Sequence, residues 1–172
     1  MLSEKKLYEL LEQKADFYNR PEFIETDPVS IPHRFSKKED IEISGFFAAT
    51  IAWGNRKMII RNANRLMEIM DNAPYDFVVN HNENELKKLE GFVHRTFNST
   101  DAATFVTSLK NIYLNRGGLE KVIAGGYLKT GGIFGALTEF FDVFFSVEHL
   151  PRTQKHISNP AKGSAAKRMN IM

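Results

Sequence analysis

The chain has 172 residues, 42% hydrophobic and 26% charged, which is typical of one globular domain and excludes a disordered or fibrous chain. Cysteine is absent, which excludes disulfides, thiolate catalysis and cysteine-ligated metal centres. The formal net charge is +2, but residues 149–172 hold five basic side chains and no acidic one. A charged start and short apolar runs predict a soluble, cytoplasmic protein that does not cross a membrane.

Helical periodicity describes the first half of the chain. Apolar residues recur at helical spacing over residues 7–18, and a proline-containing, irregular stretch follows over residues 21–35. Ser36 and Glu39 have the spacing of a capping box, which predicts the start of a helix that is apolar on nearly all sides. A further helix is expected from about Lys57 until a proline-containing turn closes it.

The second half of the chain continues the helical pattern. A polar cluster at residues 98–101 offers capping oxygens to an apolar stripe, and a core helix is expected over residues 137–145. Between them we expect a short helix over residues 119–124, bounded by glycines that include the pair at residues 125–126. No alternating run predicts a sheet. The sequence therefore predicts an all-α fold in one helical domain over residues 1–172.

Two strings that combine histidine, arginine and phenylalanine are the first candidates for chemistry. Residues 32–35 and 93–97 place Arg34 and Arg95 just ahead of helices, where the pair would be able to clamp an anion. In the alternative interpretation each phenylalanine anchors its loop, and the arginine pairs with a helix end or an acid. The five histidines lack metal-ligand spacing and no nucleotide-binding glycine loop occurs, so we expect neither metal nor cofactor.

A glycine bend provides the second candidate site. Trp53, Asn55 and Arg56 combine an aromatic ring, an amide and a guanidinium around this bend, which would suit a pocket that stacks a nucleic-acid base. The alternative is structural, because Trp53 at the end of a buried helix is expected to belong to the core.

The most distinctive local pattern lies at residues 157–169. A proline-led turn, a glycine, a serine and small residues with basic neighbours predict a hairpin and a helix from Ser164, whose N-terminus would hold a phosphate. The expected nucleic-acid-binding residues are Lys162, Gly163, Ser164, Lys167 and Arg168. Their cations would supply salt-dependent affinity. The alternative is a plain loop with a solvated basic face.

Two resemblances follow from these strings. The chain resembles a bacterial family of unknown function, domain of unknown function family 2400, through residues 40–49, 52–56, 94–97 and 158–169. Residues 160–166 also resemble, in degenerate form, the hairpin of helix-hairpin-helix DNA glycosylases. This remote resemblance implies an orthogonal helical bundle, double-stranded DNA as partner and a base flipped into a pocket.

The hairpin departs from the glycosylases at the positions that carry chemistry. In members with lyase activity, a hairpin lysine attacks the sugar and a later aspartate assists departure of the base. The aligned lysine position is Ala165 here, and Lys162 and Lys167 lie out of register. The aspartate would lie beyond Met172, so we expect a chain truncated at its C-terminal end, and whether the protein is an enzyme stays open.

The leading functional hypothesis is therefore a cytoplasmic DNA-binding relative of base-excision glycosylases, with its phosphate contact near residues 160–164. The alternative is a non-catalytic helical protein that binds a protein partner through its basic C-terminal face. Salt distinguishes them, because binding through several cations weakens steeply as salt rises and an apolar interface does not.

Overall fold

The structure is a computed structural model that describes residues 3–171. Its α-helices are α1 Glu4–Tyr18, α2 Pro21–Glu25, α3 Lys38–Thr50, α4 Arg56–Ile69, α5 Pro74–Asn80, α6 Glu83–Lys87, α7 Ser99–Asn115, α8 Leu119–Thr130 and α9 Ile133–Phe144. Its 3₁₀ turns are η1 Pro28–Ser30, η2 Pro32–Arg34, η3 Pro151–His156, η4 Pro160–Lys162 and η5 Met169–Ile171. Within the described residues, no helix is both long and apolar enough to cross a membrane.

The prediction of an all-α fold is confirmed, with one small addition. Strands β1 (Val93–His94) and β2 (Phe97–Asn98) form a two-residue antiparallel ribbon that the sequence pattern did not predict. The ribbon is too short to produce a detectable alternation of polar and apolar residues.

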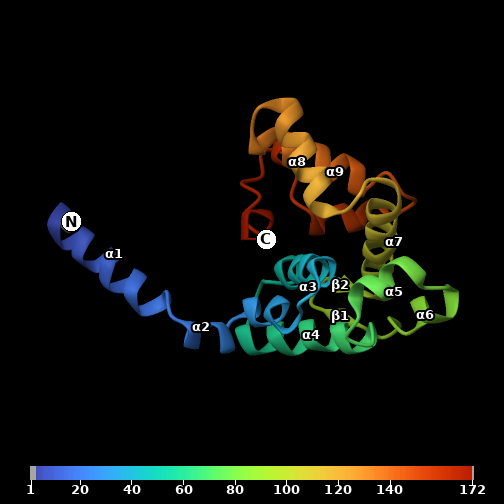
Figure 1. Cartoon of the computed structure of the whole chain (residues 1–172), viewed down its shortest axis with the longest axis horizontal. Coiled ribbons are helices and arrows are strands. Elements are labelled where there is room, and N and C mark those ends of the chain that lie inside the picture. Colours follow the sequence, from blue (N-terminus) through green and yellow to red (C-terminus); the bar gives the residue numbers. More distant parts are fainter. Residues whose placement is uncertain (1–2, 172) are drawn as a thin grey trace.

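α3 lies at the centre of the fold. Figure 1 shows α4, α5, α6 and the ribbon on one side of α3 and the α8–α9 pair on the other, with α7 connecting the two groups. Helix α1 projects away from this body and is joined to it through α2. The C-terminal segment returns to α3, which η5 contacts.

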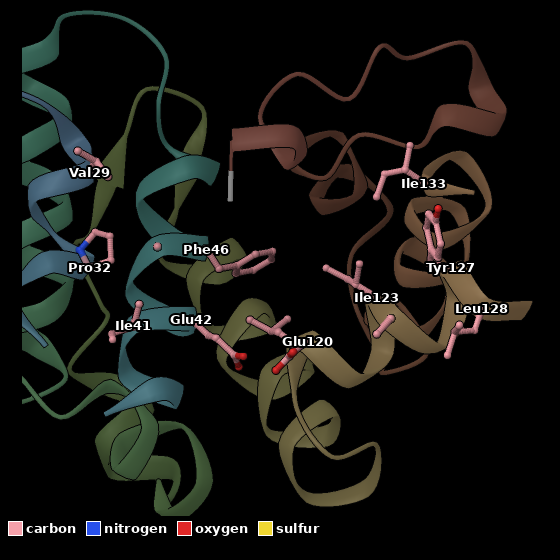
Figure 2. Close-up of a pocket in the computed structure, with 13 residues that line it drawn as sticks. Val29, Pro32, Ile41, Glu42, Phe46, Glu120, Ile123, Tyr127, Leu128 and Ile133 are labelled. Atoms are coloured by element: carbon pink, nitrogen blue, oxygen red, sulfur yellow. The ribbon is translucent and has the colours of Figure 1, made fainter. Parts of the chain in front are cut away.

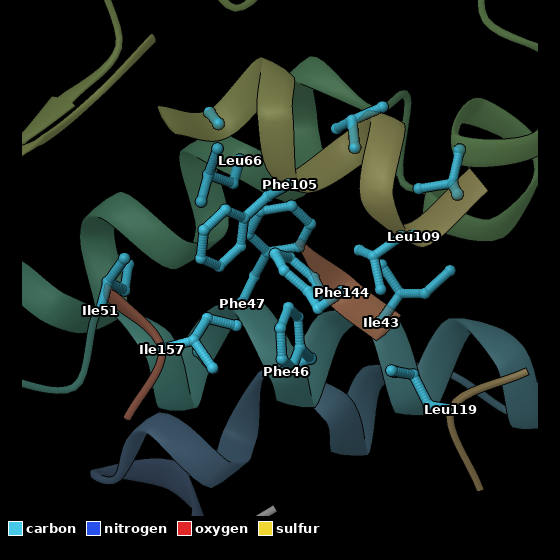
Figure 3. Packing of buried hydrophobic residues seen from close by; sticks show 14 of the residues in the cluster. Ile43, Phe46, Phe47, Ile51, Leu66, Phe105, Leu109, Leu119, Phe144 and Ile157 are labelled. Atoms are coloured by element: carbon cyan, nitrogen blue, oxygen red, sulfur yellow. The ribbon is translucent and has the colours of Figure 1, made fainter. Parts of the chain in front are cut away.

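Phenylalanine rings from three helices form the centre of the core. Phe46 and Phe47 of α3 meet Phe105 of α7 and Phe144 of α9, and all four are fully buried (Figure 3). The ring centres of Phe105 and Phe144 lie 4.8 Å apart, and those of Phe46 and Phe105 lie 5.6 Å apart. The expectation that α3 is buried on most sides is confirmed.

The predicted cap forms at the start of α7 but not at the start of α3. The cap ahead of α7 forms as a capping box, in which the Asp101 amide donates to Asn98 Oδ1 over 3.2 Å and the Asn98 amide donates to Asp101 Oδ2 over 3.0 Å. The capping box predicted at Ser36 is wrong, because α3 is capped by Lys37 without a side-chain hydrogen bond. Lys38 instead makes ion pairs with acids of α3 and α8.

The glycine pair at residues 125–126 does not end a helix, so that prediction is wrong. α8 continues to Thr130, and Gly126 lies inside it, against α9. A Cβ at Gly126 would lie 2.9 Å from Ala136 Cα. The glycine therefore allows two helix backbones to approach closely, which outweighs its low helix propensity.

The stretch over residues 21–35 is also more regular than predicted. It contains α2, η1 and η2, each with a proline in its first turn. Proline fits this position because it has a helical φ and the amide it lacks would have no intrahelical partner.

Phe105→Ala should lower the free energy of unfolding by about 3–5 kcal/mol, because Phe105 is fully buried and touches phenylalanines of three elements. Phe134→Ala is the matched control, since Phe134 is 62% exposed on α9. Denaturant titration measures both values. Equal losses in the two variants would contradict the packing described here.

Candidate functional site

The turn between α3 and α4 is where the structure brings several sequence-predicted residues together. α3 ends at Thr50, and residues 53–56 lead into α4. The β1–β2 ribbon lies alongside α4 (Figure 1). Gly54 has a φ of +109°, a conformation that residues with a Cβ rarely adopt, so it allows the chain to change direction here.

His94 fixes the ribbon to the turn. Its ring is buried, with Nδ1 2.9 Å from the Asn62 side-chain nitrogen and Nε2 3.3 Å from the Trp53 carbonyl oxygen. An amide nitrogen only donates and a carbonyl only accepts, so this pattern fits a neutral ring protonated at Nε2. Burial lowers the pKa of His94, which favours the same neutral form. Ribbon, turn and α4 are thereby joined at one buried ring.

Arg95 occupies the tip of the ribbon, directly over Trp53. Its φ is +57°, and its guanidinium carbon lies 5.0 Å from the centre of the Trp53 ring. A Cβ at Gly54 would lie 2.5 Å from Arg95 Nη1, so a larger residue there would displace the guanidinium from this position. Trp53 therefore serves as a platform that orients an exposed guanidinium.

The exposed side of α4 carries a stripe of cations that the sequence analysis missed. Lys57, Arg61 and Arg65 follow one another at four-residue spacing, which places them on one helix face, and all three are exposed. Within the part of the chain that the structure describes, none of them takes part in an ion pair. The signal was available in the sequence, because residues 43–67 contain no acid.

The stripe continues toward the ribbon. The Arg65 guanidinium lies 5.9 Å from the ring centre of Phe92, the residue just before β1. Asn62, one turn earlier on α4, holds His94 of β1. The α4 stripe and the ribbon tip therefore lie on adjoining elements, and we call Lys57, Arg61, Arg65 and Arg95 the basic face.

The predicted pocket of Trp53, Asn55 and Arg56 is not formed by all three residues. A cavity of about 440 Å³ lies beside the turn, and Gly54 and Arg56 line it together with mainly apolar residues of η1, α3 and α4. Trp53 packs toward the ribbon instead, and Asn55 caps α4 by accepting the Met58 amide over 3.3 Å. Of the three residues, Arg56 alone lines the cavity.

The C-terminal hairpin differs from its prediction. Within residues 3–171, no α-helix begins at Ser164, and the chain forms η4, a loop and η5. Gly163 and Ala166 have positive φ values of 79° and 48°, which interrupt a helix, and Ala166 is buried in the core. The helix N-terminus that was expected to hold a phosphate is therefore absent from the described residues.

The basic residues of this segment have different surroundings. Lys162 Nζ lies 5.4 Å from the ring centre of Phe141, and Lys167 is exposed. Ser164 accepts a hydrogen bond from the Ala166 amide over 3.2 Å, and residues 164–168 line a shallow cavity of about 280 Å³. Lys162 and Lys167 are thus the cations of the expected set that point outward.

Arg168 is instead part of the fold. It is half-buried, and its Nη1 donates to the Thr50 carbonyl over 2.8 Å, at the C-terminal end of α3. Burial lowers the pKa of Arg168 from that of an exposed guanidinium, but the partial negative charge of the helix end favours a cation here. Arg168 thus joins the C-terminal segment to the end of α3 at Thr50, which lies three residues before Trp53 in the sequence.

Arg152 is likewise held internally. Its Nη1 lies 2.9 Å from Oδ2 of Asp101, a fully buried carboxylate that also accepts the Thr153 hydroxyl over 2.7 Å. Because the carboxylate is surrounded by donors, the cluster stabilises the start of α7 against η3. Two of the five basic residues after position 148 therefore serve the fold.

The anion clamp proposed from Arg34 and Arg95 does not form. Arg34 donates to the side chains of Asn64 and, over 2.8 Å, Asn72, near the C-terminal end of α4. Arg95 lies at the other end of α4, beside Gly54. The two guanidinium groups therefore have separate roles.

Comparison with known proteins identifies a family and no individual relative. Residues 27–172 match the family model described as Protein of unknown function (DUF2400). No curated protein sequence and no solved structure matches the chain. The match covers the basic face and the core and excludes α1. Among residues 3–171, no group of three or more histidines and acids is placed to hold a metal ion.

Acidification should destabilise the fold through His94. The unfolded ring takes up a proton near its ordinary pKa of about 6.5, and the buried ring resists protonation, so stability is full above that pH and falls below it. Burial lowers the pKa of His81 and His156 as well, so several histidines contribute to the fall of the free energy of unfolding with pH. His94→Gln should make the fall shallower, whereas His33→Gln, at an exposed position, should not. Denaturant titrations at a series of pH values measure the difference, and an unchanged slope in His94→Gln would contradict the assignment.

Proposed function

The chain belongs to the DUF2400 family of proteins of unknown function, and we propose that it binds nucleic acid through the phosphate backbone on its basic face. The observation that supports the proposal best is the row of exposed cations on α4, which no acid accompanies over residues 43–67. Affinity for a polyanion through such a row needs no base-specific contact.

The spacing of the row suits a phosphate backbone. Lys57 and Arg65 are eight residues apart, so their Cα atoms span about 12 Å of helix. That distance corresponds to three or four nucleotides along one strand of a duplex, at about 3.4 Å of axis each. Arg95 extends the row from the ribbon, and its stacking on Trp53 reduces the conformational entropy that binding would cost.

Lys162 and Lys167 are the outer contacts in this proposal. The segment that contains them is tied to the end of α3 by Arg168, so it is fixed relative to the turn. Double-stranded DNA is the partner in this proposal, from the remote sequence resemblance of residues 160–166 to the helix-hairpin-helix glycosylases, although no α-helix begins at Ser164 in the described part of the chain. We propose binding and assign no base-excision activity, since Ala165 stands at the position of the catalytic lysine and has no nucleophile.

Binding of a protein partner through the basic C-terminal face has less support. Arg152 and Arg168 are bonded within the fold, so this face has fewer cations to offer than the sequence implies. No specific observation favours that function over nucleic-acid binding.

Fluorescence anisotropy of a short labelled DNA duplex, titrated with the chain over a salt series, tests the proposal. Four phosphate contacts from the basic face predict a slope of log K against log salt of about −3 to −4, and Lys162 and Lys167 would steepen it. Lys57→Gln/Arg61→Gln/Arg65→Gln should reduce the slope by almost three and weaken binding at low salt by at least tenfold.

The control removes the same charge elsewhere. Lys87→Gln/Arg116→Gln/Lys121→Gln alters exposed positions on α6, at the end of α7 and on α8, and should leave the slope close to that of the wild type. Lys162→Gln/Lys167→Gln tests the outer contacts and keeps Arg168, so it leaves the bond to α3 intact. Equal losses in the α4 variant and its control, or no binding by the folded wild-type chain, would overturn the proposal.

A further inference from the structure

Helix α1 has an apolar face with no partner within the described residues. None of the residues over Glu4–Tyr18 is buried. Leu7, Leu10 and Leu11 are 39–58% exposed, and Phe17 and Tyr18 continue the same stripe at helical spacing. A 15-residue helix is marginal in water without packing, so a stable α1 requires a surface to cover this stripe.

The body of the protein has an apolar groove that also lacks an occupant. It lies between η1, η2 and α3 on one side and α8 and α9 on the other, with a volume of about 750 Å³ (Figure 2). Ile41, Tyr127, Leu128 and Ile133 line it and remain between 40% and 82% exposed. Such a contiguous apolar surface is typical of an interaction site.

The groove and α1 also carry charged side chains. The charged residues that line the groove are Glu42 of α3 and Glu120 of α8, on opposite sides in Figure 2. On α1, Lys14 interrupts the apolar stripe between Leu11 and Phe17, and no ion pair involves it within residues 3–171. Lys38 already pairs with both carboxylates, so Lys14 would join an existing ionic cluster at the edge of the groove.

The connection between the two surfaces favours exchange between molecules. α1 continues through α2 to η1, whose Val29 lines the groove, so the attachment point lies at the groove itself. From there α1 extends away from its own body (Figure 1), which presents its stripe to another molecule. We propose that α1 of one copy occupies the groove of a second copy, and the reverse, in a symmetric exchange dimer.

The surface available is sufficient for a stable dimer. Phe17 and Tyr18 are 50–60% exposed, which leaves about 100 Å² of each side chain to bury, or roughly 200 Å² per helix. The three leucines add to this, and the groove walls lose a similar area. Two reciprocal contacts then bury more than the roughly 1,200 Å² of a standard interface.

Crosslinking between single cysteines tests the proposal directly, because the chain has no cysteine of its own. Leu11→Cys on α1 and Leu128→Cys in the groove are prepared as separate proteins of residues 1–172, one with an affinity tag. They are mixed and treated with a short bismaleimide reagent. The exchange dimer predicts a crosslinked species of twice 19.7 kDa that contains both proteins. Leu114→Cys, on α7 and similarly exposed, replaces Leu128→Cys as control and should give little of this product.

Two further experiments distinguish the exchange dimer from other possible occupants of the groove. A chain that carries both Leu11→Cys and Leu128→Cys at high dilution would crosslink without a change in mass if α1 folded back onto its own body, and this result would overturn the proposal. Light scattering should show a wild-type dimer and a monomeric Leu128→Glu variant, with Leu114→Glu still dimeric. A wild-type chain that stays monomeric at every concentration would also overturn it, and leaves the nucleic-acid proposal to its own test.

Discussion

The burial of α3 on nearly all sides is the constraint on which the rest of the structure depends. Phe46 and Phe47 need apolar partners from helices far apart in the sequence, so α7 and α9 both pack against α3. A central helix also has a C-terminal end with unpaired carbonyls, which cannot be left without donors in the interior. Arg168 supplies one such donor to Thr50, and His94 supplies another to the Trp53 carbonyl just beyond the helix.

These bonds also determine the form of the candidate site. By fixing the turn after α3, His94 holds the ribbon against α4, and Arg168 holds the C-terminal segment against the end of α3. The cations that satisfy the fold point inward, and those of the basic face point outward. Cations in one sequence can thus serve stability or binding, and the surroundings of each guanidinium distinguish the two roles.

Local signals were sufficient to predict the fold class and a cap within residues 98–101 ahead of α7, because they depend on residues within one turn of helix. The end of α8 was not predictable, since Gly126 is explained by contact with α9 and not by its neighbours in sequence. The prediction of a helix from Ser164 failed for the same reason, because burial of Ala166 competes with helix formation. The α4 cations were predictable from their spacing alone, whereas the role of Arg168 required knowledge of a residue 118 positions away.

The central claim is that the basic face binds nucleic acid. An NMR titration of the ¹⁵N-labelled chain with a short DNA duplex, at low salt, tests it most directly because each backbone amide reports its own surroundings. The account predicts shifts concentrated over residues 55–66 and 93–96, with smaller shifts over residues 160–167. Shifts confined to the groove between α3 and α8, or a spectrum unchanged by the duplex, would contradict it.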